Sequence, residues 1–186
     1  MKTHITITAG IAFIISLVLP IVAFAGGGKH LALNLIGSGA MYEGTVPDID
    51  GDLIDDPAIC FDVGLINVQT QQVIGTATDC LSQIDPIGTG LALIGTTTFH
   101  LPQGDLVTRG ATTVQPALHP TVTPTGVNIT HITGASSDQN AILTGTRRFK
   151  NATGSVRLSG MVDMTNFAGN VGDPIVFDCL FLITLD

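Results

Sequence analysis

The stretch SVRLSGMVDM, residues 155–164, alternates apolar and polar side chains with a period of two. One face carries Val156, Leu158, Gly160, Val162 and Met164, and the other carries Ser155, Arg157, Ser159, Met161 and Asp163. Successive side chains of a β-strand point to opposite faces of a sheet, so this pattern predicts a strand with one face in an apolar core. After residue 25, no long segment shows the three-to-four-residue spacing of an amphipathic helix.

Eight further segments have the composition of strands and are bounded by Gly, Pro, Asn or Asp. They are His30–Ile36, Cys60–Val68, Gln72–Leu81, Thr89–Leu101, Leu106–Val114, Val127–Ile132, Ala141–Arg148 and Ile175–Leu185. Many short strands with turns between them predict a sandwich or a barrel. The runs Leu91–Ile94 and Val176–Leu185 are apolar on both faces, which indicates strands that are covered on both sides or face a partner. The segment Gln115–Thr125 holds three prolines and is expected to be a long loop.

The first 25 residues have the organisation of a cleavable signal peptide. Lys2 precedes the apolar run from Ile11 to Ala25, which ends in the small residues Ala23-Phe24-Ala25. A membrane-spanning anchor is disfavoured, because Pro20 lies late in the run and about 20 consecutive apolar residues are needed to span a bilayer. We expect residues 1–25 to be removed, which leaves one domain, residues 26–186, secreted or periplasmic and without a stable membrane anchor.

The chain is acidic and carries few charged groups. Seven basic and 15 acidic side chains give its 186 residues a formal net charge of −8, and removal of Lys2 with the leader leaves six against 15, or −9. Such a chain repels nucleic-acid phosphates and anionic lipids, so nucleic-acid binding is not expected.

Three cysteines remain after the leader, and export makes a disulfide feasible. The segments Cys60–Val68 and Gln72–Leu81 are expected to pair as a hairpin through residues 69–71. Counting outward from that turn brings Cys60 opposite Cys80 within about one residue, close enough for a bridge. The alternative is three reduced, buried cysteines. Cys179 is expected to be a small core residue rather than a nucleophile.

Several of these pieces together resemble a known superfamily. They are ICFDV (59–63), QVIGTATDC (72–80), TTTFHLPQGDL (96–106), ITG (132–134) and GTRRFKNATGSVRL (145–158). The third is similar to a "TxTFxLPxGxI" hairpin, and the last two are similar to an "ITGGTGxYxGAxGxVxL" signature. Their order resembles the allene oxide cyclase and dirigent barrel superfamily, in particular its bacterial secreted branch.

The resemblance implies a closed antiparallel β-barrel of about eight strands whose mouth holds a small apolar ligand. Members of the superfamily include cyclases acting on unsaturated fatty-acid epoxides, proteins that orient phenoxy radicals, and cyclases of polyketide pathways. Related barrels assemble as dimers or trimers. This chain departs from the pattern by an insertion between Gly134 and Gly145, and by Ile94 at a position where a second cysteine is often found.

Few residues have the chemistry of a catalytic group. Glu43 and Tyr42 are the only Glu and the only Tyr, and they are adjacent in a segment after the first strand, where either could act as a general acid or base. Asp62 and Arg109 lie within expected strands and would indicate a site if they were directed into the lumen of the barrel. By default, charged side chains point outward.

The acidic run DIDGDLIDD, residues 48–56, is the weak metal candidate of the chain. Asp48, Asp50 and Asp52 alternate as in a calcium loop, but Leu53 and Ile59 replace the glycine and the bidentate glutamate that such a loop needs. A solvated acidic loop is the favoured interpretation. The histidines lack zinc-ligand spacing, and no nucleotide-binding motif is present, so no cofactor is expected.

Two functions follow from these observations. The first is a secreted barrel that binds a small hydrophobic ligand and, if it is an enzyme, isomerises or cyclises a small unsaturated apolar substrate. Its apolar residues able to face the lumen are Leu91, Leu93, Phe99, Val156, Leu158, Leu180 and Leu182. The alternative is a non-catalytic exported barrel with a structural or surface-binding role, which the scarcity of acid–base residues favours.

Overall fold

The computed structural model describes residues 29–123, 126, 128–136 and 141–186. The expected signal peptide lies outside these residues. The described chain is all-β apart from one short 3-10 helix, η1 (Arg147–Phe149), and none of its helices has the length and apolarity needed to cross a membrane. The strands are β1 (Lys29–Ala40), β2 (Tyr42–Val46), β3 (Asp56–Asn67), β4 (Gln72–Ile87), β5 (Gly90–Leu101), β6 (Gly104–Val122), β7 (Asn128–Ser136), β8 (Ile142–Gly145), β9 (Gly154–Asp163) and β10 (Pro174–Leu185).

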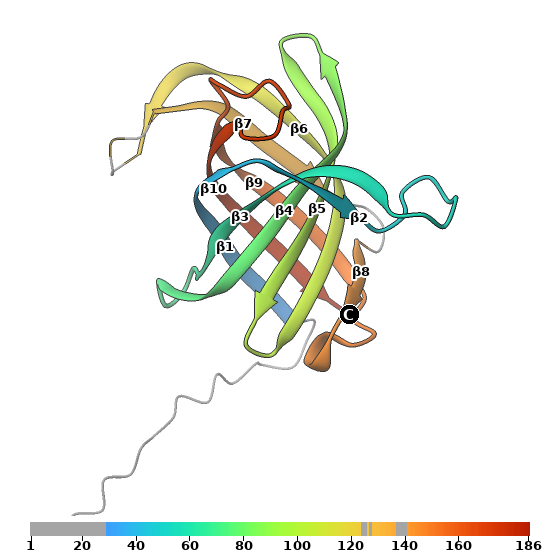
Figure 1. Cartoon of the computed structure of the whole chain (residues 1–186). Helices are drawn as coiled ribbons and strands as arrows, with labels where there is room; N and C mark the ends of the chain where they lie inside the picture. Colours follow the sequence, from blue (N-terminus) through green and yellow to red (C-terminus); the bar gives the residue numbers. More distant parts are fainter. Residues whose placement is uncertain (1–28, 124–125, 127, 137–140) are drawn as a thin grey trace, which may run out of the picture.

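Eight of these strands close into an antiparallel barrel (Figure 1). Their order is β1-β10-β9-β7-β6-β5-β4-β3, and pairing of β1 with β3 over Leu33–Ile36 joins the two edges of the sheet. The expected closed barrel is therefore confirmed. Closure pairs both edges of the sheet within the barrel wall, which limits edge-to-edge aggregation there.

The interior follows the two-residue period of the strands. On β9, Val156 and Val162 are buried inside, and Arg157 between them is exposed. Two aromatic pairs fill the centre edge to face: Phe61 with Phe177, and Phe99 with Phe181, with ring centroids 5.1 and 5.2 Å apart. These pairs combine large buried areas with the ring geometry that aromatic side chains favour.

On β10 the expectation for the lumen was partly wrong. Phe177, Cys179 and Phe181 face inward, so Leu180 and Leu182 of the intervening positions lie on the outer surface, where Leu182 is 47% exposed. The strand is apolar on both faces, and the larger aromatic side chains take the interior. The side chains of Leu180 and Leu182 therefore form part of the outer surface of the barrel.

The proline-rich segment is also different from expectation. The segment Gln115–Val122 continues β6 and pairs with β7, with a register shift between Pro116 and Thr121. Pairing with β5 ends at Val114, so the extension has a neighbour on one side only. Proline is tolerated in such an edge strand and at such an irregularity, because no second row of hydrogen bonds is needed.

The hairpin of β2 and β3 extends beyond the barrel wall. Met41 interrupts the strand between β1 and β2 and exchanges backbone hydrogen bonds with Asp173 and Gly172. A second, small apolar cluster of Val46, Ala58, Cys60 and Cys80 secures the hairpin. In Figure 1 the loop between β2 and β3 protrudes from one side of the barrel.

Candidate ligand site

A cavity lies in the barrel lumen and is lined mainly by apolar side chains. Its apolar lining includes Phe61, Leu81, Leu93, Val114, Val156, Val162, Ile175, Phe177 and Phe181. Water-sized molecules have about 40 Å³ of space inside it. A cavity of this size holds a few water molecules, since one water needs roughly 10–15 Å³ by this measure. Side chains therefore fill most of the lumen, and a small cavity with a mainly apolar lining remains.

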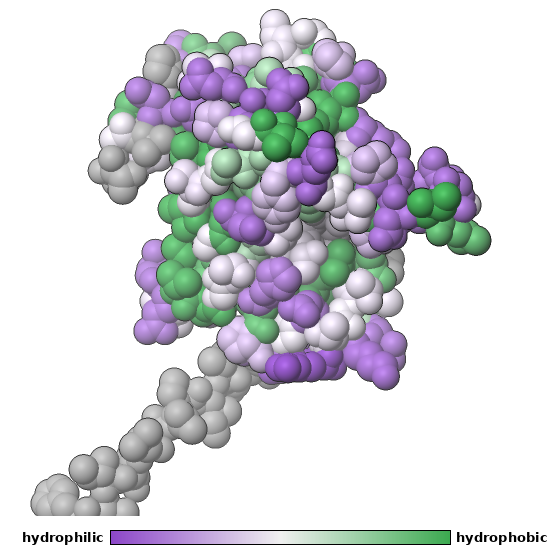
Figure 2. Space-filling model, viewed as in Figure 1, coloured by the Kyte–Doolittle hydropathy of each residue, from purple (hydrophilic) through white to green (hydrophobic). Residues whose placement is uncertain are grey.

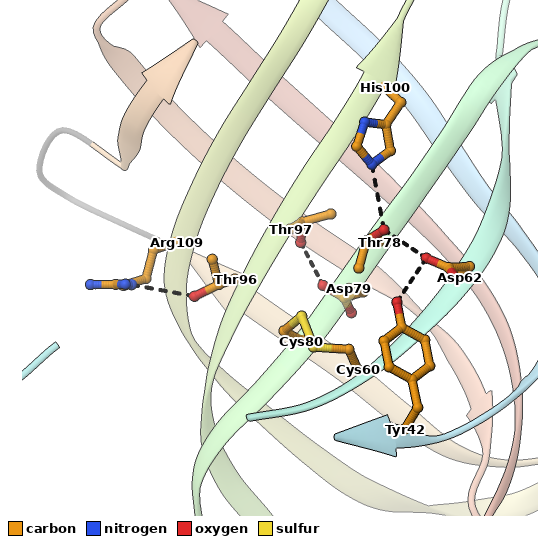
Figure 3. Close-up of a disulfide and its surroundings, with 10 residues drawn as sticks. All are labelled: Tyr42, Cys60, Asp62, Thr78, Asp79, Cys80, Thr96, Thr97, His100 and Arg109. Carbon is orange, nitrogen blue, oxygen red and sulfur yellow. Dashed lines mark hydrogen bonds between the residues drawn. A yellow bond between two sulfur atoms is a disulfide. The ribbon is translucent and has the colours of Figure 1, made fainter. Parts of the chain in front are cut away.

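Asp79 of β4 is the acidic group of this cavity. Its side chain is buried, and its Oδ1 accepts a hydrogen bond of 2.6 Å from Thr97 Oγ1 of the neighbouring strand β5 (Figure 3). Burial raises the pKa of Asp79 to about 7, against the opposing effect of the Thr97 hydrogen bond. Near neutral pH the carboxyl therefore populates both protonation states, which suits a group that exchanges a proton or a hydrogen bond with a ligand.

Thr133 of β7 supplies a second polar group to the same cavity. Its Oγ1 is buried and has no hydrogen-bond partner among the described residues. A buried hydroxyl without a partner costs free energy. A polar atom of a ligand, or a water molecule in the cavity, would satisfy it. The lumen thus combines an apolar wall with two polar groups, each able to hydrogen-bond a small molecule.

The sequence itself holds a signal for Asp79. Cys60 and Cys80 share the outer face of their hairpin, so the residue next to Cys80 must point inward. That residue is Asp79, between the inward-facing Ala77 and Leu81. A lone carboxylate on the apolar face of a strand is the pattern that predicts a lumen site.

Tyr42 and Asp62 come together, but on the outer surface of the barrel. Tyr42 Oη donates to Asp62 Oδ1 at 3.1 Å, and Thr78 Oγ1 donates to the same oxygen at 2.6 Å. Thr78 also contacts His100 Nε2 at 3.4 Å, so the four side chains form a row across the strands (Figure 3). Burial and Asp62 raise the pKa of Tyr42, which therefore stays a hydrogen-bond donor at neutral pH. A catalytic role for either residue remains a prediction.

Glu43 and Arg109 do not join that row. The side chain of Glu43 is exposed on β2. Arg109 lies on β6, and its guanidinium points away from the lumen. There it donates hydrogen bonds to the carbonyl oxygens of Pro47 and Asp48 and to Thr96 Oγ1. Arg109 thus attaches the protruding loop to the barrel. Its guanidinium lies outside the lumen, so it does not compensate the negative charge of Asp79.

Replacing Arg109 with methionine is expected to loosen this loop. The variant keeps much of the side-chain packing and loses the hydrogen bonds to two carbonyls, which predicts a loss of about 1 kcal/mol of unfolding free energy. Hydrogen exchange of the amides of residues 49–54 should accelerate. Replacing Lys150, which is exposed and lies outside the loop, with methionine is the matched control and should leave these amides unchanged.

The acidic loop brings together a slightly different set of carboxylates from the expected one. Oxygens of Asp48, Asp50 and Asp56 lie within 4.8 Å of one another, and Asp52 is not in this group. Asp48 accepts hydrogen bonds from the amides of Gly51 and Leu53, which lower its pKa, and Asp52 accepts one from Ile54. These bonds shape the loop from within, and calcium binding remains a weak prediction.

The expected disulfide is confirmed. Cys60 and Cys80 are directly opposite in the β3–β4 register, with Cα atoms 4.0 Å apart and their sulfur atoms bonded. Such a bridge is compatible with an oxidising, extracellular compartment. Cys179 is free and buried, and burial together with the charge of Asp79 raises the pKa of its thiol. A thiol in this state is a poor nucleophile, because the thiolate is the reactive form.

Comparison with known proteins adds no assignment. No protein-family model matches the chain, and no curated protein matches it at a significant level. The resemblance to the allene oxide cyclase and dirigent barrels therefore stays a prediction based on the motifs quoted above.

Proposed function

We propose that this chain is an exported barrel that binds a small, mainly apolar molecule in its lumen, with the polar end of the ligand against Asp79 and Thr133. The observation that carries the proposal is a buried carboxyl and an unpartnered buried hydroxyl at one apolar cavity. Pockets for small molecules combine an apolar lining with a few polar groups that fix the orientation. The leader and the disulfide support export.

The charge of the lumen limits the class of ligand. Asp79 is the acidic residue of the cavity lining, and the guanidinium of Arg109 is turned toward the loop outside. A carboxylate ligand would meet Asp79 without a cation to compensate, at a high cost in a medium of low dielectric constant. The proposed ligand is therefore neutral at its buried end, for example an alcohol or a ketone. A ligand of more than a few heavy atoms must displace side chains or extend to the mouth of the barrel.

A second candidate function is proton-transfer catalysis of the isomerase or cyclase type on such a ligand. The specific observation in its favour is the raised pKa of Asp79, at about 7. A carboxyl with this pKa can give or take a proton near neutral pH. The non-catalytic alternative, a structural or surface-binding barrel, draws support from the small free volume of the lumen.

Replacing Gly110 with valine should close the lumen without disturbing the wall. Gly110 of β6 lines the cavity, and a Cβ placed there would meet no atom within 4 Å. We expect n-hexanol to shift the amide NMR signals of Asp79 and Thr133 in the parent protein, and to bind on the order of tenfold more weakly to the variant. Native mass spectrometry of the protein purified from its host would then identify the natural ligand.

The matched control is Gly134→Val, on the outer face of β7 and outside the cavity lining, where an added Cβ also meets no atom within 4 Å. It should leave binding unchanged once its fold is verified by circular dichroism. Equal binding of hexanol to the Gly110 variant and to the parent would place the ligand elsewhere, and the lumen proposal would fail.

A further inference from the structure

The loop between β2 and β3 ends in two exposed apolar side chains. Leu53 is 92% exposed and Ile54 is 68% exposed. Figure 2 shows hydrophobic atoms at the end of this protruding loop, in a surface otherwise rich in polar groups. We call Leu53 and Ile54 the knob. The backbone of Leu53 is left-handed, with φ 70°, a conformation that glycine adopts without strain and leucine does not. Leu53 is thus unfavourable for the isolated chain for two reasons: its apolar side chain is exposed to water, and its backbone is in a strained conformation.

The knob is held in a fixed shape. The Asp48 carboxylate accepts hydrogen bonds from the Gly51 and Leu53 amides, and the Asp52 carboxylate accepts one from Ile54 at 2.8 Å. Arg109 fastens the start of the loop to the barrel through the carbonyl of Asp48. Strained and exposed residues on a fixed support indicate a contact surface, since a preorganised loop loses little entropy on binding.

A hollow of about 630 Å³ lies on the outer wall of the same barrel, across β6, β7, β9 and β10. We call it the hollow, and its lining includes Ala111, Thr113, Gly134, Ser136, Arg157, Ser159, Leu180 and Leu182. Its floor is open above Gly134, where an added Cβ would meet nothing within 4 Å. Leu182, 47% exposed, and the half-buried Leu180 give the hollow an apolar part on β10. Knob residues do not line it, so the two surfaces are separate within one chain.

The charges around the two surfaces are complementary. The loop that carries the knob and the first residue of β3 together carry five carboxylates, those of Asp48, Asp50, Asp52, Asp55 and Asp56. The hollow contains the exposed Arg157, for which the described residues offer no ion pair. Opposite charges at the edges of two apolar surfaces orient an encounter between them. The acidic loop also disfavours anionic lipid as the occupant of the knob.

We propose that the knob of one copy of this chain docks into the hollow of a second copy. Leu53 and Ile54 then contact Leu180 and Leu182, and the aspartates of the loop approach Arg157. The contact joins two different surfaces, so it is heterologous unless both copies exchange knobs. A contact made by the two side chains of the knob is expected to bury less than the roughly 1,200–2,000 Å² of a standard interface, so we expect a dissociation constant in the micromolar range.

Sedimentation velocity of the purified protein, from micromolar concentrations to about 100 μM, tests the proposal. The knob variant is Leu53→Ser/Ile54→Ser, and the hollow variant is Gly134→Val, which adds bulk where the structure leaves space. Each variant should weaken self-association by on the order of tenfold or more. The control is Leu118→Ser, since Leu118 is 93% exposed on the extension of β6 and lies outside both surfaces. It should associate like the parent.

Mixing the two variants gives the decisive result. The knob variant keeps an intact hollow and the hollow variant keeps an intact knob, so the equimolar mixture should recover a 1:1 complex that neither variant forms alone. Thermal melts of each variant verify folding. The proposal is overturned if the parent is monomeric at all concentrations, if the mixture does not associate, or if the knob instead drives binding to phosphatidylcholine vesicles.

Discussion

Replacing Asp79 with asparagine is expected to stabilise the protein at pH 8 and to flatten the fall in its stability between mildly acidic and neutral pH. Burial raises the pKa of the folded-state carboxyl from 3.8 to about 7. Between these values the unfolded chain has lost the proton and the folded chain retains it, so the free energy of unfolding decreases as the pH rises. The slope is about 1.4 kcal/mol per pH unit, and the total is at most roughly 4 kcal/mol. Below the pKa of Asp79 in the unfolded chain, both states hold the proton, and the full contribution of the neutral carboxyl to the free energy of unfolding is present.

Urea denaturation of both proteins at half-unit steps from pH 4.5 to pH 8.5 measures this effect. Asparagine has the same shape and retains an oxygen that can accept the hydrogen bond from Thr97. The matched control is Asp85→Asn, an exposed position on the same strand, for which the difference between pH 5 and pH 8 should equal that of the parent. A parent slope that survives in the Asp79 variant would show that another group causes it.

Removing the disulfide is expected to cost about 3 kcal/mol of unfolding free energy by the chain-entropy relation. The bridge joins residues 20 apart in the sequence and packs with Val46 and Ala58 in the small outer cluster. The Cys60→Ala/Cys80→Ala variant should therefore have a lower urea midpoint and unfold at a lower temperature than the parent. Reduction of the parent with dithiothreitol should produce a similar decrease.

Cys179 provides the control for this experiment. It is buried inside the barrel and is not bridged, so the Cys179→Ala variant should respond to dithiothreitol as strongly as the parent does. If dithiothreitol fully reduces the parent and leaves its urea midpoint unchanged, the stabilising role of the bridge is refuted.

Sequence alone was sufficient where the physics is local. Alternation over residues 155–164 fixed which side chains of β9 face the core, because a strand cannot present consecutive residues to one face. Counting from the turn after Asn67 brought Cys60 within one residue of Cys80, and a register shift between Leu65 and Ile66 places the two directly opposite. Each of these features depends on residues close together in the chain.

Tertiary structure alone decided the features that depend on competition between distant segments. On β10 both faces are apolar, and only the packing of Phe177 against Phe61 and of Phe181 against Phe99 decided that Leu180 and Leu182 lie outside. The proline-containing segment after Gln115 could form a strand because the pairing of β6 with β5 ends at Val114. Closure of β1 on β3 buried Asp79 and placed Tyr42 and Asp62 on the exterior. The two-residue period states which residues share a face, and the packing of the whole barrel decides which face is inside.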